Sequence, residues 1–343
     1  MKHAIRILIS SLLLLASNPP LGAQPALADL QRGVDWGVDH HYDQALALFT
    51  RLDQDHPHHP APTFYRAAIY QSMMLDYETV TWRPLFYQDI EQTIHRARQL
   101  LSHQPQDPQA QFYAGAACAY KSAQLVRDGK YWPAWRAIDT ALDYLNPLLR
   151  QDSSHCDALL GVGTYQYWRS YLTKSLSWLP FFPDRRREGI EKIVRVSECG
   201  QLSQSSAWSN LAWIYIREKN YAQAIAYAEK GLTAFPGSRF FLWPLAEAHF
   251  LDHNWAAAFS IYDTLLISTR AAEHNNGYNE LVILWKMAQC AEQMGDLQGA
   301  ETLYWETAEC RVDAEMAKRA ENKKQAAAKW LARHAGEMAE SGS

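Results

Sequence analysis

The sequence lacks several features that would narrow its class at once. No stretch supplies the roughly 20 consecutive apolar residues that a membrane-spanning helix needs. Glycine (16) and proline (15) are too scarce among 343 residues for a collagen-like or low-complexity chain. Positive charge is not in excess, since 33 lysines and arginines face 37 aspartates and glutamates and the net charge is −4. This balance gives no reason to expect a nucleic-acid partner, whose binding depends on neutralising phosphates.

Signature motifs of common enzymes and metal proteins are also missing. The sequence has no G-x-S-x-G, no H-E-x-x-H and no glycine-rich phosphate loop, and its five cysteines contain no C-x-x-C pair. His56, His58 and His59 would form only a weak transition-metal site, because His40 and His41 lie roughly 20 Å away at the other end of one helix. We therefore expect no catalytic residue, no metal site and no cofactor.

The first 28 residues are typical of a secretory signal. Lys2 and Arg6 precede an apolar run over residues 7–16, and two prolines end it. Cleavage is expected after Ala23 or Ala28, with an uncleaved anchor as the alternative. No cysteine lies near either site, which disfavours a lipid anchor. We expect export across the inner membrane, to the periplasm. An odd number of cysteines leaves at least one unpaired there, and most of the five are expected to be buried as small hydrophobic residues.

What the sequence does contain is a repeat of helical pairs. The clearest unit runs from Trp208 to Pro236, and intervals of three and four give each of its two helices one apolar stripe. Its signature positions are Trp208, Leu211, Ala212, Tyr215, Tyr221, Ala224, Ala228, Gly231 and Pro236. On these residues the segment resembles a tetratricopeptide repeat, the 34-residue helix-turn-helix unit of α-solenoids. A second unit follows in phase, with Ala258 34 residues after Ala224.

The remaining units keep the pattern with less regular spacing. The next repeat is offset by 42 residues, which places about eight extra residues between Thr269 and Asn279. Upstream, an apolar stripe that includes Tyr131 is expected to pair with Gly115, and Gly161 is expected to pair with Gly189. The resemblance implies an all-α, right-handed α-solenoid of about seven helical pairs. The expected divisions are a signal (1–28), irregular repeats with inserts (29–200), regular repeats (201–308) and a polar capping helix with tail (309–343).

The resemblance also implies a binding surface. In such solenoids the first helix of each unit lines the concave groove, so the side chains on that face are the expected partner-binding residues. They are Asn210, Trp213, Arg217, Phe240, Trp243, Glu247, Phe250, Trp285, Lys286 and Gln289. Aromatic side chains supply large contact area at low entropic cost. The alternative for the three tryptophans is packing between neighbouring helices.

The insert over 164–183 is a second candidate, because it is apolar on all sides. Its aromatic residues Trp168, Tyr171, Trp178, Phe181 and Phe182 are expected either to contact a ligand or membrane surface or to fold back as core. The basic run that follows, Arg185, Arg186 and Arg187, is expected to be either an anion site or a solvated turn balanced by Glu188 and Glu191.

These features favour a non-catalytic interaction scaffold or adaptor in the periplasm that binds a peptide or protein in its groove. Two alternatives remain. A carrier or sensor of an apolar ligand requires an apolar cavity beneath the 164–183 insert. A carbohydrate-active enzyme requires two carboxylates about 5 to 10 Å apart in an aromatic cleft, and Glu247 beside Trp243 is the single candidate. Fold alone does not decide among these.

Overall fold

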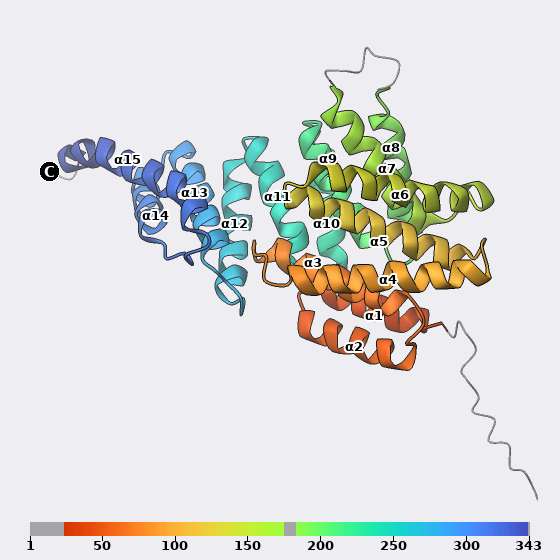
Figure 1. Cartoon of the computed structure of the whole chain (residues 1–343). Coiled ribbons are helices and arrows are strands. Elements are labelled where there is room, and N and C mark those ends of the chain that lie inside the picture. Colours follow the sequence, from red (N-terminus) through yellow and green to blue (C-terminus); the bar gives the residue numbers. More distant parts are fainter. Residues whose placement is uncertain (1–23, 175–182, 342–343) are drawn as a thin grey trace, which may run out of the picture.

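The computed structural model describes residues 24–174 and 183–341, with side chains of the last helix described as far as residue 334. Within these ranges every regular element is a helix, and consecutive helices pack against each other along the chain (Figure 1). The prediction of an all-α solenoid is confirmed. The expected signal lies almost entirely outside the described residues, as do Trp178, Phe181 and Phe182.

Fourteen of the described helices form seven successive pairs, and a fifteenth follows them. The pairs are α1 (Leu27–Val38) with α2 (Tyr42–Asp55), α3 (Ala61–Asp76) with α4 (Arg83–His103), α5 (Pro108–Arg127) with α6 (Tyr131–Gln151), α7 (Cys156–Leu172) with α8 (Arg186–Cys199), α9 (Gln204–Arg217) with α10 (Tyr221–Ala234), α11 (Arg239–Leu251) with α12 (Trp255–Arg270), and α13 (Tyr278–Gln293) with α14 (Leu297–Glu309). The last helix is α15 (Ala317–Ser341).

The turns inside the pairs α9–α10, α11–α12 and α13–α14 share one design. In the α9–α10 turn, Lys219 adopts a left-handed φ of 58°, and the Asn220 side chain then accepts a hydrogen bond from the Gln223 backbone N–H. The α11–α12 and α13–α14 turns repeat this arrangement with Asn254 and Asp296 as the capping residues. A left-handed residue ends the first helix, and the cap satisfies a free N–H of the second. Each turn therefore reverses the chain within a few residues.

Small residues allow the two helices of each pair to approach closely. Ala212 and Ala224 are fully buried in the pair α9–α10, and Ala246 and Ala258 are fully buried in the pair α11–α12. In the pair α1–α2, a Cβ atom added to Gly33 would lie 2.3 Å from the Phe49 ring, so only glycine fits there. In these three pairs, residues of the apolar stripes predicted from the sequence thus form the contact between the two helices.

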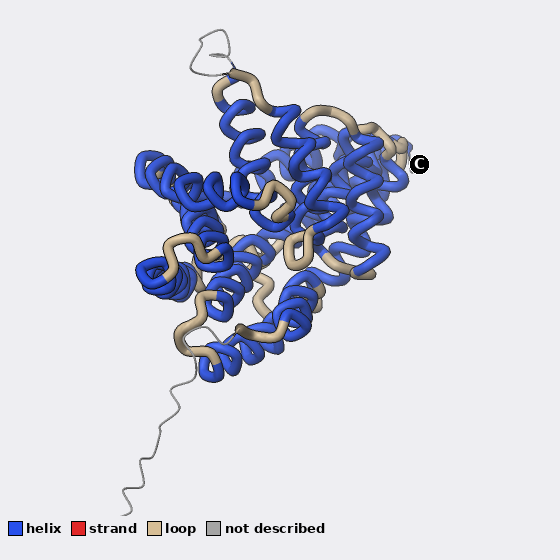
Figure 2. The backbone as a smooth tube through the Cα atoms, turned by 90° about the vertical axis from the view of Figure 1, so that its right-hand side faces the viewer, coloured by secondary structure: helices blue, strands red, loops and turns tan. Residues whose placement is uncertain are grey.

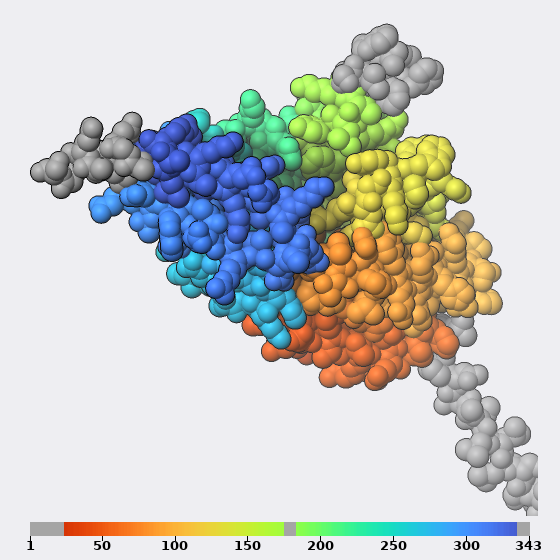
Figure 3. All heavy atoms as spheres, turned by 60° about the vertical axis from the view of Figure 1, so that its left-hand side comes forward, coloured from red at the N-terminus to blue at the C-terminus, as the bar shows by residue number. Residues whose placement is uncertain are grey.

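The solenoid winds far enough for its C-terminal half to contact its N-terminal pairs (Figure 3). Figure 2 shows how the helices wind. The Arg239 guanidinium on α11 donates to both carboxylate oxygens of Asp76 on α3, at 2.9 and 2.5 Å. The Tyr42 hydroxyl donates to the same carboxylate, and the Ser238 hydroxyl donates to the Val38 carbonyl. We call this contact the clasp; it joins α11 to the turns that follow α1 and α3.

The loop between α12 and α13 extends the clasp. Asn276 donates its side-chain N–H to the Tyr77 carbonyl at 2.8 Å, and Asn279 donates to the Asp76 carbonyl at 2.6 Å. The His274 ring packs edge-on against Tyr77. The extra residues predicted between Thr269 and Asn279 therefore reach the N-terminal half, which explains why this unit breaks the 34-residue period.

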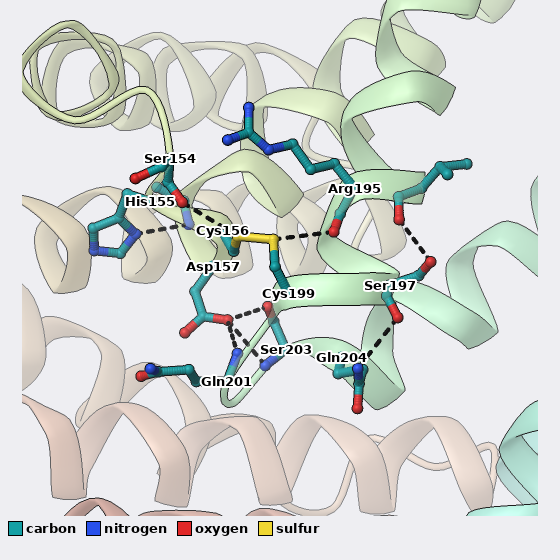
Figure 4. The surroundings of a disulfide bond; sticks show 12 residues. Ser154, His155, Cys156, Asp157, Arg195, Ser197, Cys199, Gln201, Ser203 and Gln204 are labelled. Carbon is teal, nitrogen blue, oxygen red and sulfur yellow. Dashed lines mark hydrogen bonds between the residues drawn. A yellow bond between two sulfur atoms is a disulfide. The ribbon is translucent and has the colours of Figure 1, made fainter.

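One disulfide joins the first residue of α7 to the last residue of α8 (Figure 4). Cys156 and Cys199 are 43 residues apart in sequence, and their Cα atoms are 5.9 Å apart. The other three cysteines are free and buried, and burial raises the pKa of the Cys118 thiol to about 11 and that of Cys290 to about 12. These thiols are packing residues, whereas the disulfide fixes the pair that carries the 164–183 insert.

The C-terminal helix covers the end of the solenoid. Trp330 and Ala327 on α15 are buried against Tyr304 and Ala300 of α14, and the Tyr304 and Trp330 rings lie 4.5 Å apart. The expected helix from residue 309 differs in one respect. Residues 310–316 form a connection, within which the Asp313 N–H donates to the Asn276 carbonyl, and the helix begins only at Ala317. This hydrogen bond holds the connection against the loop between α12 and α13, which we call the clasp loop.

Candidate functional site

The predicted groove residues lie on α9, α11 and α13, the first helices of three successive pairs. Asn210, Trp213 and Arg217 are on α9; Phe240, Trp243, Glu247 and Phe250 are on α11; Trp285, Lys286 and Gln289 are on α13. None of them is fully buried. The repeat positions therefore place all ten on faces that retain solvent access.

An ion pair joins α11 to α13 at the centre of this set. The Lys286 ammonium lies 2.9 Å from Glu247 Oε2, and the Tyr262 hydroxyl donates to the same oxygen at 3.0 Å. Burial, and then the Glu247 carboxylate, raise the pKa of Tyr262 well above its usual value. The Lys286 ammonium also lies 3.8 Å from the centre of the Phe250 ring, within range of a cation–π contact. Side chains from two successive units thus meet around one charge pair.

The three tryptophans differ in how much surface they expose. Trp243 packs edge-on against Tyr262, and Trp285 packs edge-on against Tyr304, so both are half-buried between helices. Trp213 is 39% exposed. Both alternatives therefore hold in part for Trp243 and Trp285, because each ring packs against a neighbouring helix and is still partly exposed to solvent. Trp213 is the freest aromatic surface of the set.

The polar residues on α9 stand next to Trp213. Asn210 uses its N–H group on the Ser206 carbonyl of its own helix at 2.9 Å, which leaves its carbonyl oxygen as the group available to a partner. Arg217 is exposed, and within the described residues it has no ion-pair or hydrogen-bond partner. Phe240 on α11 and Gln289 on α13 are half-buried. Trp213, Asn210 and Arg217 therefore supply one apolar contact, one acceptor and one free cation.

The described part of the aromatic insert is a continuation of α7. Trp168 and Tyr171 are half-buried, and both pack around the fully buried Tyr167. A surface cavity of about 160 Å³ lies elsewhere, beside the end of α4 and the α4–α5 loop, and is lined largely by polar side chains that include Gln24, His59 and Gln109. Neither observation favours the apolar carrier.

The basic run after the insert is largely engaged with carboxylates. Arg186 pairs with both Asp184 and Glu218, and Arg187 pairs with Glu191. Arg185 precedes the first residue of α8, and its backbone N–H donates to the Ser170 hydroxyl. The structure therefore does not gather the three guanidinium groups around one anion position.

The histidines singled out in the sequence are also separated. His59 accepts a hydrogen bond from the Ala61 N–H at 3.1 Å and packs edge-on against Tyr113, while His40 lies at the clasp, 3.8 Å from Asp76. Across residues 24–174 and 183–341, no group of three or more histidine, cysteine or acidic side chains is placed to hold a metal ion. Glu247, the single candidate acid, has Lys286 and Tyr262 as its hydrogen-bonding partners.

One exposed feature was missed by the sequence analysis. Tyr131, Trp132 and Trp135 in the first turns of α6 are 70%, 67% and 52% exposed. Tyr131 had been expected on the apolar stripe of its pair, and this expectation is wrong. Ala134 and Ala141 of the same expected stripe are buried and form the inward face of α6. The available signal was three aromatic residues within five positions, which exceeds what one apolar stripe can bury.

Comparison with known proteins supports the repeat locally. Residues 205–238 match the family model described as tetratricopeptide repeat. This segment is a tetratricopeptide repeat. No curated protein matches the sequence. None of the helices in the described ranges is long and apolar enough to cross a bilayer.

Several solved structures are similar to this chain at low identity. PilW, a type IV pilus biogenesis factor, is 15% identical over 76% of this chain and 97% of its own, with a TM-score of 0.45. Pseudomonas aeruginosa pilF is 17% identical over 76% and 95%, with a TM-score of 0.44. Yeast Tom70 is 10% identical over 87% and 88%, with a TM-score of 0.33. At TM-scores below 0.5, neither the architecture nor the function of this chain follows from these likenesses.

Proposed function

We propose that this protein is a non-catalytic scaffold that binds an extended segment of a protein partner on the concave face of α9, α11 and α13. The observation that carries the proposal is the cluster of Glu247, Lys286 and Phe250, beside which Trp213 and Arg217 remain available to a partner. The cluster joins two units and supplies a preformed surface, which reduces the ordering that binding requires.

The chemistry of this face defines the partner. Glu247 and Lys286 neutralise each other, so the centre of the face favours an apolar or aromatic side chain over a charged one. The Asn210 carbonyl oxygen can accept a backbone N–H from an extended peptide. Arg217 can pair with an acidic side chain or a C-terminal carboxylate. The expected ligand is therefore a segment with apolar residues and one acidic group.

Two observations support a periplasmic location. The N-terminal segment is typical of a secretory signal, and the Cys156–Cys199 disulfide suits an oxidising compartment. Helix α1 begins at Leu27, and Leu30 is already buried. Cleavage after Ala23 would leave α1 whole, whereas cleavage after Ala28 would remove its first two residues. We therefore propose Ala23 as the last residue of the signal, which N-terminal sequencing of the exported protein tests.

The groove is tested with substitutions that spare packing. Trp213→Ala combined with Arg217→Ala removes the exposed apolar and cationic groups of α9. Trp305→Ala is the matched control, because Trp305 is 60% exposed on α14. Crosslinking in intact cells, followed by affinity capture and mass spectrometry, should show partner proteins lost from the double variant and retained in the control. Equal recovery from both variants, with unchanged circular dichroism, would exclude this face as the binding site.

A further inference from the structure

The start of α6 carries an aromatic patch that nothing in the described chain covers. Trp132 and Trp135 lie one helical turn apart with ring centres separated by 5.1 Å and planes inclined by only 20°, so the two rings stack on each other. Tyr131 adjoins them, and all three side chains are more than half exposed. We call Tyr131, Trp132 and Trp135 the α6 aromatic patch. Contiguous apolar patches of this kind mark interaction sites, unlike single exposed residues such as Trp305.

Cations surround this patch. Arg127 is the last residue of α5, Lys130 directly precedes α6, and Arg136 follows Trp135; all three are exposed and have no ion-pair or hydrogen-bond partner for their side chains among the described residues. The one acid within 126–136, Asp128, is occupied by Arg83 and by the Tyr87 hydroxyl. The next acid on α6 is Asp139, one turn further along. A chain of net charge −4 therefore places three unpaired cations next to a cluster of exposed aromatic residues.

The position of the patch explains why it is uncovered. The turn between α1 and α2 is covered by Ser238, and the connection between α3 and α4 is covered by the clasp loop through Asn276. The turn between α5 and α6 is next in this series, and Asp128 joins it to α4. The winding of the solenoid brings C-terminal residues over the first two turns, whereas the first residues of α6 remain exposed.

We propose that the α6 aromatic patch, with Arg127, Lys130 and Arg136, binds the surface of an anionic phospholipid bilayer. Tryptophan and tyrosine are the side chains that settle at headgroup level, where one end of the ring system is apolar and the other is wet. Exposed lysine and arginine residues add attraction to anionic headgroups, and the start of a helix adds a favourable dipole. Binding of this kind is shallow and reversible. It would hold the scaffold at a membrane while leaving the groove of α9, α11 and α13 to a protein partner.

The test measures vesicle binding by the full-length protein without any partner, so its outcome does not depend on the groove. Five proteins with the same N-terminus are compared: the wild type, W132A/W135A, R127Q/K130Q/R136Q, and two controls. W305A removes an exposed tryptophan outside the patch, and K219Q/K318Q/K329Q removes three exposed lysines outside it. Co-flotation is measured with vesicles of phosphatidylglycerol and phosphatidylcholine, and with vesicles of phosphatidylcholine alone.

We expect the wild type to bind the anionic vesicles and both patch variants to lose at least about tenfold in partition coefficient. In R127Q/K130Q/R136Q the loss follows from charge, since each cation near the surface contributes roughly a fivefold factor. In W132A/W135A it follows from the loss of the two rings that sit at headgroup level. Both controls should bind like the wild type, and 0.5 M salt should weaken binding. Brominated lipids should quench tryptophan emission in the wild type and not in W132A/W135A. Binding that is absent, that ignores lipid charge, or that falls equally in the controls would overturn the proposal.

Discussion

Asp76 and Arg239 are separated by 163 positions in the sequence, yet they form a bidentate ion pair in which both side chains are about nine-tenths buried. Tyr42 adds a third hydrogen bond to the carboxylate, and Ser268 accepts one from the guanidinium. A solenoid is normally held together by neighbouring units only. This pair adds a contact between units that are not neighbours, so the curvature of the solenoid depends on it.

Breaking the clasp should open the solenoid. Arg239→Met leaves the Asp76 carboxylate buried without its cation, which typically costs about 3 kcal/mol or more. We expect a lower free energy of unfolding in urea and a larger radius of gyration by small-angle scattering. Arg217→Met is the matched control, because Arg217 is exposed and unpaired and its loss should change stability by less than about 0.5 kcal/mol. An unchanged radius for Arg239→Met would show that the clasp does not set the shape.

Two buried histidines should make the fold sensitive to acid. Burial lowers the pKa of His40 and of His59 to about 4, from 6.5 in the unfolded chain. Between these values the unfolded chain binds protons that the folded chain does not, so stability falls as the pH falls from 6.5 towards 4. Each histidine should account for a loss of about 3 kcal/mol across this window.

The measurement is the free energy of unfolding at pH 7.5, 6.0 and 4.5. His40→Asn and His59→Gln should each reduce the pH dependence, and asparagine suits position 40 because His40 has a φ of 65°. A wild-type curve that is flat between pH 7.5 and 4.5, or variants that follow the wild-type slope, would show that these histidines do not titrate as proposed.

The crossing of α7 and α8 depends on glycine at one position and tolerates alanine nearby. A Cβ atom at Gly189 would lie 2.6 Å from the Gly163 carbonyl oxygen, whereas one at Gly161 would meet only a Leu145 methyl group at 3.1 Å. We expect Gly189→Ala to lower the free energy of unfolding by about 2 kcal/mol. Gly161→Ala should be neutral or stabilising by up to about 1 kcal/mol, because alanine favours the helix. Equal effects in urea unfolding would contradict this packing.

The helical repeat was predictable from the sequence, whereas the clasp between the C-terminal half and the N-terminal pairs was not. Three- and four-residue intervals around Ala212 and Ala224 define two helices and their contact face, because local periodicity carries that information. Asp76 meets Arg239 only because the small rotations between successive helical pairs add up along the solenoid. No local sequence pattern predicts that total rotation. The eight-residue surplus before Asn279 was visible as an irregularity, yet its target at Tyr77 was not.

The candidate site shows the same division. Repeat positions assigned Trp213 and Glu247 to the groove, and both side chains keep solvent access, but the pairing of Glu247 with Lys286 required the spacing of two helices. Tyr131 shows the opposite failure, because a repeat register assigns every aromatic residue near an expected stripe to the core. Whether an aromatic residue at the edge of a helix is covered depends on the neighbouring turns.

The disulfide should contribute to stability only in an oxidised protein. Linking Cys156 to Cys199 closes a loop of 43 residues, for which chain-entropy estimates give about 4 kcal/mol. Reductant or the Cys156→Ser, Cys199→Ser double variant should therefore lower the thermal midpoint. Mass spectrometry after alkylation in denaturant should find three thiols in protein purified from its own host, consistent with three free cysteines. Five alkylated thiols would contradict both the disulfide and an oxidising compartment.

The central claim is that a protein partner occupies the concave face of α9, α11 and α13. The most direct measurement places a photo-crosslinking amino acid at Trp213, or at Ile267 on α12 as a control, in living cells. Ile267 is 66% exposed on the second helix of its pair, so it is more accessible than Trp213 and lies outside the predicted face. We predict discrete protein adducts from position 213 that are absent from position 267. No adduct at 213, or the same adducts from both positions, would contradict the scaffold function.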